Sequence, residues 1–297
     1  MITVFLGGGR ITSALLAGLR RAGYNQPLIV HDRNAHKLRA LRSEFKVATE
    51  SDLLAAITQA ELLIVAVRPQ DVTDVLGKIR TAVSSTRDPR TSRTFARKRP
   101  AIACSVAAGI PLKNLHTALP GPFCWARAMP SPASRFGRGL AAVAFDKSCP
   151  KSARKIVTTF FANVGPVLEI AEREYDAFTV TYSTTHGYHA LAALAGAAES
   201  LGLDRRTALA AAAHALADGV LAWREGNLSL AALLEEGATP GGIAAEVMRT
   251  MDAQGYQRSV KRGLQSGLVR TRRNAKKRSK QQTKTSQEDN KKSPQAS

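Results

Sequence analysis

The chain has 297 residues, of which 44% are hydrophobic and 22% charged, with 43 Lys and Arg against 23 Asp and Glu. This composition excludes a disulfide-dense miniprotein, a collagen-like chain and wholesale disorder, and the length suggests about two domains. No apolar run reaches the ~18 residues typical of a membrane-spanning helix, and the first residues carry no basic leader, so we expect a cytoplasmic protein.

The first predicted unit is a strand, a glycine turn and a helix. Residues 2–6 form an apolar, β-branched run typical of a strand, three glycines follow at 7–9, and apolar residues then recur at helical spacing. Such a turn can hold the diphosphate of a dinucleotide at the helix N-terminus. Gly7 would permit the sharp bend, and Gly9 would let the backbone approach the anion. Thr12 replaces the usual third glycine, and a plain turn is the alternative.

The second predicted strand, residues 27–33, ends where a dinucleotide fold contacts the adenosine ribose. Asp32 would accept a hydrogen bond from a 2′-hydroxyl, which favours NAD, or it would cap the next helix. Arg33, with Lys37 and Arg39 downstream, would instead neutralise a 2′-phosphate, which favours NADP. Because the cations outnumber the carboxylate, we expect NADPH as the cofactor, with NADH as the alternative.

A later strand is predicted at residues 61–67, which are almost continuously apolar, as in a parallel sheet covered on both faces. Strands that alternate with helices predict a doubly wound α/β domain. Residues 80–100 then carry seven basic residues and one acidic residue, and we interpret them as a basic insertion.

The three cysteines, Cys104, Cys124 and Cys149, have no C-x-x-C spacing. Their odd number predicts reduced thiols in or near the core of a cytosolic protein and excludes a four-thiolate zinc site. The six histidines form no metal-ligand motif either, so we expect no metal.

The second half of the chain is predicted to be helical. Its Ala- and Leu-rich segments are residues 190–201, 205–223, 230–235 and 243–253, with Asp204 and Ser229 as caps. The alanines of 205–223 would let helices approach closely, within the chain or across to a partner.

The last segment of the sequence is a basic tail. From residue 270 onward it carries 10 basic and 2 acidic residues and almost no apolar ones. It cannot bury enough surface to offset its ordering entropy, so it is predicted to be disordered. Weak, salt-sensitive polyanion binding is the alternative to a merely solvated tail.

Four further segments accompany the glycine turn. They are Ala66-Val-Arg-Pro-Gln70, Ser105-Val-Ala-Ala-Gly-Ile110, Arg127-Ala-Met-Pro-Ser131 and Pro240-Gly-Gly242. Together with residues 7–12 they resemble the pyrroline-5-carboxylate reductase family in order and spacing. The resemblance implies an α/β Rossmann-type dinucleotide-binding domain followed by an all-α dimerisation domain, and a homodimer. It also implies NAD(P)H-dependent reduction of the cyclic imine pyrroline-5-carboxylate to proline, a step of proline biosynthesis.

On this basis we expect a Rossmann domain at residues 1–165, a helical substrate and dimerisation domain at 166–268, and a disordered basic tail at 269–297. Hydride transfer would take place in the cleft between the two domains.

The resemblance also implies the cofactor site. Residues 66–70 would edge the nicotinamide half of the cofactor, and residues 107–109 would leave room for the ring, although a strand-end turn explains both segments equally well. The candidate cofactor-binding residues are Gly7, Gly9, Arg10, Ile11, Thr12, Asp32, Arg33, Ala66, Val67, Arg68, Pro69, Ala108 and Gly109.

The substrate side departs from the family's pattern. Ser131 replaces the Asn of Arg-x-Met-Pro-Asn, and His186 replaces a proline before the retained Tyr188. Ile243 and Ala244 occupy the positions whose hydroxyl would bind the imine nitrogen. His186 is therefore a candidate proton donor, or it merely lines a helix N-terminus. The candidate substrate-binding residues are Met129, Ser131, Tyr188, Thr239, Gly241 and Gly242.

One lost hydrogen bond to the imine costs about 1–3 kcal/mol, which would weaken the activity without abolishing it. The altered segments 182–188 and 239–244 leave another small imine or keto substrate open. A non-catalytic NADP-binding or nucleic-acid-associated protein is a further alternative.

Overall fold

The structure is a computed structural model that describes residues 1–85, 102–120 and 123–291, and the side chains of 1–82, 102–120 and 123–273. The chain divides into two compact units. We call Met1–Thr179 together with the chain from Leu268 onward the sheet unit, and Val180–Gly267 the helical unit.

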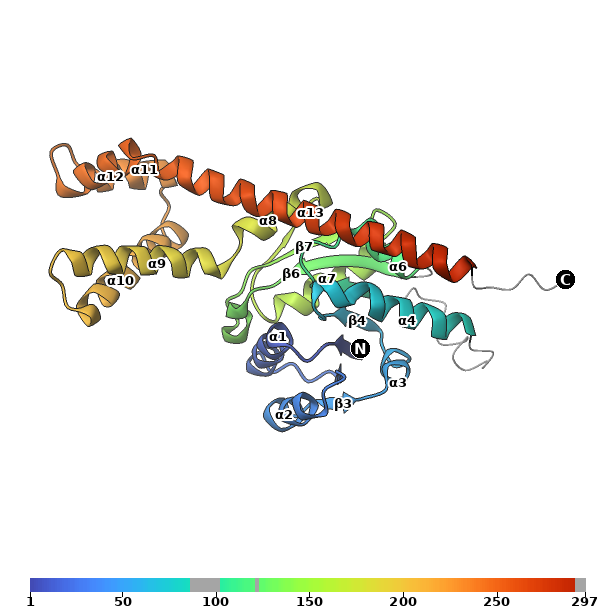
Figure 1. Cartoon of the computed structure of the whole chain (residues 1–297). Coiled ribbons are helices and arrows are strands. Elements are labelled where there is room, and N and C mark those ends of the chain that lie inside the picture. The colour runs from blue at the N-terminus through green and yellow to red at the C-terminus, as the bar shows by residue number, and fades with distance from the viewer. Residues whose placement is uncertain (86–101, 121–122, 292–297) are drawn as a thin grey trace. The chain divides into compact units, whose positions relative to one another are not determined.

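The sheet unit is built on eight strands among the described residues, in the order β3-β2-β1-β4-β5-β6-β7-β8. Figure 1 draws the strands as arrows and labels β3, β4, β6 and β7. All neighbouring strands are parallel except β6 and β7, which are antiparallel. The strands are β1 (Thr3–Leu6), β2 (Leu28–His31), β3 (Ala48–Glu50), β4 (Leu62–Val65), β5 (Ile102–Ser105), β6 (Cys124–Met129), β7 (Ala141–Phe145) and β8 (Val167–Glu169).

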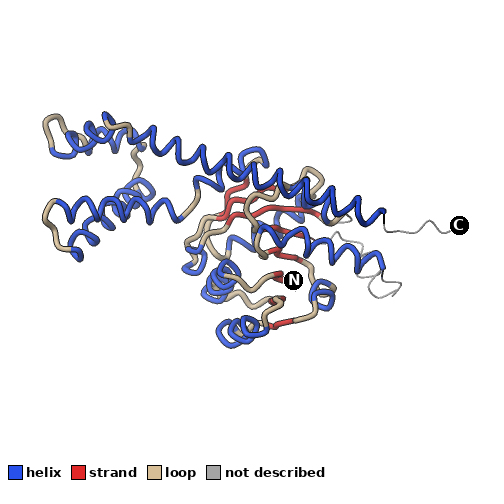
Figure 2. The backbone as a smooth tube through the Cα atoms, in the orientation of Figure 1, coloured by secondary structure: helices blue, strands red, loops and turns tan. Residues whose placement is uncertain are grey.

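Helices connect the strands of this unit, as the alternation of blue and red in Figure 2 shows. They are α1 (Arg10–Arg21), α2 (Ala35–Phe45), α3 (Leu53–Ile57), α4 (Val72–Ser85), α6 (Leu112–Ala118), α7 (Lys151–Ala162) and α8 (Glu172–Thr181), with the 3₁₀ turns η1 (Pro69–Asp71) and η2 (Pro132–Phe136).

The sheet has a hydrophobic core on each face, which β1 illustrates because its side chains alternate. Phe5 belongs to the core that contains residues of α1, α2 and α7, and its ring centroid lies 6.1 Å from that of Phe160. Val4 and Leu6 belong to the other core, with residues of α3, α4 and α6. The predicted doubly wound α/β fold is therefore confirmed.

The helical unit contains α9 (Thr184–Ser200), α10 (Arg205–Glu225), α11 (Leu230–Gly237), α12 (Ile243–Ala253) and the first part of α13 (Tyr256–Lys291). Both predicted caps are confirmed. Asp204 accepts hydrogen bonds from the N–H groups of Arg206 and Thr207, and Ser229 accepts one from Ala232. Ala195, Ala208 and Ala212 of α9 and α10 are buried, whereas many larger apolar side chains of this unit are exposed.

The expected domain boundary after residue 165 is wrong. β8 pairs in parallel with β7, with Ala141 opposite Val167, so the sheet continues past residue 165. The sheet unit also includes α8 as far as Thr179, because Glu172 and Asp176 of this helix form ion pairs with Arg127 of β6. A three-residue strand and a short helix carry too little periodicity to mark such a boundary in the sequence.

The basic tail also differs from the expectation of disorder from residue 269. The backbone of α13 is helical as far as Lys291. Lys, Arg and Gln are good helix formers, and a helix that has already started adds residues without a new nucleation cost. Residues 80–85 of the expected insertion belong to α4, and the rest of that insertion up to residue 100 lies outside the described residues.

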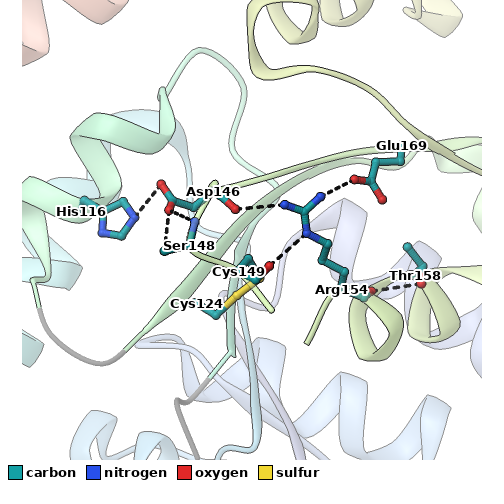
Figure 3. The surroundings of a disulfide bond; sticks show 8 residues. All are labelled: His116, Cys124, Asp146, Ser148, Cys149, Arg154, Thr158 and Glu169. Carbon is teal, nitrogen blue, oxygen red and sulfur yellow. Dashed lines mark hydrogen bonds and ion pairs between the residues drawn. A yellow bond between two sulfur atoms is a disulfide. The ribbon is translucent and has the colours of Figure 1, made fainter. Parts of the chain in front are cut away.

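The expectation of three reduced thiols is wrong for two of them. Cys124 at the start of β6 and Cys149 before α7 form a disulfide, with their Cα atoms 5.1 Å apart (Figure 3). They lie 25 residues apart, so no local spacing signals the pairing. Cys104 is a free, buried cysteine, and its burial raises the pKa of its thiol well above the usual range.

The sequence predicts neither a membrane-spanning helix nor a metal site. None of the helices in the described part of the chain is both long enough and apolar enough to cross a membrane. The described residues also contain no group of three or more His, Cys, Asp or Glu side chains placed to hold a metal ion.

Candidate functional site

The expected cofactor segments follow the carboxyl ends of parallel strands at one edge of the sheet. In the register, Leu6 of β1 lies beside His31 of β2 and Val65 of β4. Val65 lies beside Ser105 of β5, which lies beside Arg127 of β6. The strand order reverses between β1 and β4, and this is where ligands bind in open α/β sheets.

Gly7 forms the bend that leaves β1, and a side chain there would be strained. Its φ is +107°, and a Cβ atom at this position would lie 2.8 Å from the carbonyl oxygen of Ala66. The Gly7 N–H donates to the carbonyl of His31 at 2.7 Å, and the Ala66 N–H donates to that of Leu6 at 2.8 Å. The turn is thus fixed to the ends of both neighbouring strands.

Gly9 is the N-cap of α1, and it leaves the helix end open. No side chain caps this end, the first turn has no acidic residue, and a Cβ at Gly9 would meet no atom within 4 Å. The helical hydrogen bonds begin with the Ser13 N–H, which donates to Gly9. The N–H groups of residues 10–12 therefore precede the helix's own bonds and can bind an anion.

Thr12 explains how the turn forms without a third glycine. Its side chain is fully buried, and its hydroxyl donates to the carbonyl oxygen of Gly7 at 2.6 Å. A second bond braces the same turn, because the Gly8 N–H donates to Oδ2 of Asp32 at 2.8 Å.

Asp32 therefore has a structural role at the end of β2. Its Oδ1 accepts from the N–H of Asn34 at 2.9 Å, and Lys37 Nζ lies 3.7 Å from its Oδ2. The alternative in which Asp32 caps α2 is wrong, because Asn34 is the N-cap and accepts from the Lys37 N–H. Arg33 and Lys37 are exposed beside the turn, where they can meet a phosphate.

The two candidate nicotinamide loops lie beyond β4 and β5. After β4, Ala66 is buried, Val67 is half-buried, Arg68 is exposed, and Pro69 begins η1. After β5, Ala108 is exposed, and Gly109 has a φ of +69°. The loop after β4 leads into a 3₁₀ turn, and the loop after β5 contains the small residues Ala107, Ala108 and Gly109.

The candidate substrate-binding residues Met129 and Ser131 lie at the same edge of the sheet, at and just after the end of β6. Met129 is half-buried at the end of the strand. Ser131 is buried and is the N-cap of η2, where its hydroxyl accepts a hydrogen bond from the Ala133 N–H at 3.2 Å.

In the helical unit, His186 lies in the first turn of α9. Its Nε2 is 2.6 Å from the carbonyl oxygen of Val180, so one ring nitrogen is already engaged. Tyr188 is exposed on the same helix.

Residues 239–242 form a turn that ends at the N-cap of α12. The Gly242 N–H donates to the carbonyl of Thr239, and Gly241 has a φ of +76°. No side chain caps α12, so the N–H groups that follow Gly242 are available to an anion.

Sequence reasoning missed one buried cluster of the sheet unit. Arg127 of β6 is 1% exposed and forms ion pairs with Glu172 and Asp176 of α8. A charged residue within an otherwise apolar strand, together with carboxylates at i and i+4 of a helix, is the signal that was available.

Two known families match the chain. Residues 2–88 match the family described as NADP oxidoreductase coenzyme F420-dependent, and residues 172–274 match the pyrroline-5-carboxylate reductase dimerisation family. The first match contains the glycine turn and the β2 end, and the second begins at the first residue of α8.

Curated relatives align over nearly the whole chain. A pyrroline-5-carboxylate reductase of Mycobacterium tuberculosis is 28% identical over 286 residues, which cover 90% of this chain and 94% of the relative. The enzyme of the same name from Haemophilus influenzae is 25% identical over 275 residues, which cover 91% and 96%.

Solved structures share the fold. A pyrroline-5-carboxylate reductase of Coxiella burnetii has a TM-score of 0.79 at 20% identity, covering 92% of this chain and 98% of its own. The Plasmodium falciparum pyrroline carboxylate reductase with NADP bound has a TM-score of 0.78 at 18% identity, covering 93% and 98%. A sheet unit followed by a helical unit is thus common to this chain and to these two structures. The chain matches the pyrroline-5-carboxylate reductase dimerisation family over residues 172–274 and is similar over nearly its whole length to pyrroline-5-carboxylate reductases.

Proposed function

We propose that this protein reduces pyrroline-5-carboxylate to proline with NADPH as the hydride donor. The observation that carries the proposal is the β1–α1 turn, where Gly7, Thr12 and an uncapped helix end form a preorganised anion site in a chain similar to pyrroline-5-carboxylate reductases. The relatives' names supply the substrate.

The residues present fit a dinucleotide. The free N–H groups at the start of α1 suit its diphosphate, and Arg33 and Lys37 suit a 2′-phosphate. When bound, the nicotinamide supplies a hydride to the imine carbon, and a proton must reach the imine nitrogen. Residues 66–69 would edge the nicotinamide half of the cofactor, and the small residues 107–109 would leave room for the ring.

The turn at 239–242 is the proposed site for the substrate carboxylate. Its Pro-Gly-Gly backbone leads into an uncapped helix, whose N–H groups and dipole favour an anion. Met129, Ser131 and Tyr188 are proposed to contact the rest of the imine. Holding the reacting carbon against the cofactor accounts for most of the rate, because positioning lowers the entropic part of the barrier.

His186 is the proposed proton donor, acting through Nδ1, because Nε2 already contacts Val180. Replacing it with Gln keeps a side-chain donor for Val180 and removes the imidazole ring. A fall in kcat for the imine with an unchanged KM for NADPH would support this role. An unchanged kcat would assign His186 to the α8–α9 bend alone.

The direct test of the proposed function is oxidation of NADPH by the full-length protein with pyrroline-5-carboxylate. We expect turnover that depends on the imine, and no turnover at saturating imine would refute the proposal. The second candidate substrate is another small imine or a keto acid, because Ile243 and Ala244 lack the hydroxyl that would bind the imine nitrogen. A substrate panel decides between them by comparing kcat/KM. Cofactor binding without turnover of any substrate would indicate a non-catalytic NADP-binding protein.

We also propose a homodimer formed through the helical unit. Leu209, Leu216, Val220 and Trp223 recur on one stripe of α10 and are between 37% and 55% exposed. In a single chain this apolar stripe is exposed to water, and a second copy of the chain would cover it. The cytoplasmic location stays a prediction.

The basic tail carries a separate proposal of weak polyanion binding. Deleting residues 270–297 removes ten basic and two acidic residues. Retention on heparin should then fall, with strong salt sensitivity in the full-length chain, while reductase activity is retained. Unchanged retention would refute the proposal.

A further inference from the structure

The cluster around Arg127 is the most deeply buried charged group in the described part of the sheet unit. Arg127 Nη1 lies 2.9 Å from Glu172 Oε1, and Nη2 lies 3.2 Å from Asp176 Oδ1. The guanidinium carbon is 3.8 Å from the ring centroid of Tyr175, which is fully buried. Burial raises the pKa of the Tyr175 phenol, so the ring stays neutral beneath the cation.

One planar guanidinium thus meets three side chains on one face of α8. Glu172, Tyr175 and Asp176 lie at helix positions i, i+3 and i+4, which share a face. Two separate N–H donors of Arg127 serve two carboxylates, and its flat surface stacks on the phenol ring. A lysine has the same charge but presents a compact ammonium that cannot reproduce this geometry.

The cluster connects directly to both loops that follow β5 and β6. Glu172 Oε1 also accepts a hydrogen bond from the N–H of Leu112 at 3.0 Å, at the point where the loop after β5 enters α6. The N-cap residue of that helix supplies no side-chain acceptor, so Glu172 provides one from α8. Arg127 itself precedes Met129 and Ser131 by two and four residues.

We propose that Arg127 is a positioning residue for the reaction. Through Glu172 it holds the loop of residues 106–111, the proposed neighbour of the nicotinamide ring, and through β6 it holds the proposed substrate segment 129–131. It touches neither the cofactor nor the substrate. This inference rests on the proposed function for its catalytic readout, but the coupling of Arg127 to the loop can be measured without any activity.

The experiment compares Arg127→Lys with Arg154→Lys in the full-length protein. Arg154 is a matched control, because its Nη1 pairs with Glu169 at 2.7 Å and its guanidinium carbon lies 5.2 Å from the Phe145 ring centroid. Figure 3 shows this pair beside the disulfide. Arg154 also donates to the carbonyl oxygens of Cys149 and Asp146, in the segment between β7 and α7, rather than to the loops that follow β5 and β6.

For Arg127→Lys we expect kcat/KM for the imine to fall about tenfold to a hundredfold, because small misplacements of reacting groups are that costly. The KM for NADPH should stay near the wild-type value, because the diphosphate and ribose sites lie at β1 and β2. Arg154→Lys should change neither constant. Glu172→Gln, which keeps an acceptor for Leu112 and Arg127, should lose less activity than Glu172→Ala.

Hydrogen–deuterium exchange provides the readout that does not need activity. In Arg127→Lys, residues 106–112 should exchange faster than in the wild type, and in Arg154→Lys they should not. Three results would each overturn the proposal. The first is an equal loss of kcat/KM in Arg127→Lys and Arg154→Lys, and the second is an equal rise of the KM for the imine and the KM for NADPH in Arg127→Lys. The third is unchanged exchange of residues 106–112 in Arg127→Lys. A wild-type protein without imine turnover would refute the proposed function and leave the exchange comparison to decide the role of Arg127.

Discussion

At the residue scale, two glycines of the same turn differ in what they tolerate. Gly7 has a positive φ, and a Cβ atom there would lie 2.8 Å from a backbone carbonyl oxygen. Gly9 has an extended conformation and open space around it. The first glycine is required by the fold of the turn. The second is required only by the ligand that we propose to bind there.

We therefore predict different outcomes for two alanine variants. Gly7→Ala should lower the free energy of unfolding by about 1–3 kcal/mol through backbone strain, and should also weaken NADPH binding. Gly9→Ala should melt at the wild-type temperature and yet bind NADPH more weakly, because its methyl group would face the diphosphate. Calorimetric titration with NADPH and thermal melts check both variants. Unchanged affinity in Gly9→Ala would place the diphosphate elsewhere.

We propose that single residues also decide the choice between the two nicotinamide cofactors. Asp32 engages both carboxylate oxygens with backbone N–H groups, while Arg33 and Lys37 remain exposed beside it. Replacing Arg33 with Ser should lower kcat/KM for NADPH about tenfold, the value of one hydrogen bond to a charged group. The value for NADH should hardly change. Arg42→Ser, in the last turn of α2, is the control, and equal losses with both cofactors would contradict a 2′-phosphate contact.

At the scale of elements, the sequence predicts those parts whose signals are local. The β1 strand, the glycine turn, the caps Asp204 and Ser229, and α12 all follow from patterns a few residues long. α8 could not be placed in the same way. Its position in the sheet unit depends on Arg127, which lies 45 and 49 residues from its two carboxylate partners.

The same argument applies to the candidate site. Residues 7–12, 66–69 and 107–109 could be proposed as site segments from sequence because they follow strands of a parallel sheet, whose carboxyl ends meet at one edge. The bracing roles of Thr12 and Asp32 could not, because a hydrogen bond from the Gly8 N–H to a carboxylate in the next strand depends on the register of β1 and β2.

The exposed stripe of α10 gives the prediction for the helical unit. Val220→Glu places a charge on a surface proposed to be covered by a second copy, which should cost on the order of 2 kcal/mol or more. We expect this variant to dissociate into monomers at concentrations where the wild type is dimeric, as measured by light scattering. Phe136→Glu is the matched control, since Phe136 is a comparably exposed apolar residue of the sheet unit. A Val220→Glu protein that stays dimeric would exclude this stripe from the interface.

At the scale of the whole molecule, the two hydrophobic cores pack segments that are distant in sequence against the sheet. Three further features connect distant segments to β6. Arg127 ties β6 to α8, and the disulfide ties it to the segment before α7. The third is the antiparallel pairing with β7. The strand that carries the proposed substrate residue Met129 and leads to Ser131 is therefore held at both of its ends.

The stability of the sheet unit should consequently depend on redox conditions. Cys124 and Cys149 close a loop of 25 residues, and cross-linking a loop of that size stabilises a protein by about 3 kcal/mol. Adding a thiol reductant should lower the melting temperature of the wild type and leave that of a Cys124→Ala/Cys149→Ala double variant unchanged. Thiol counting on the unreduced, denatured protein should find Cys104 alone. Three reactive thiols there, or equal melting of the wild type with and without reductant, would show that the bond is not present in solution.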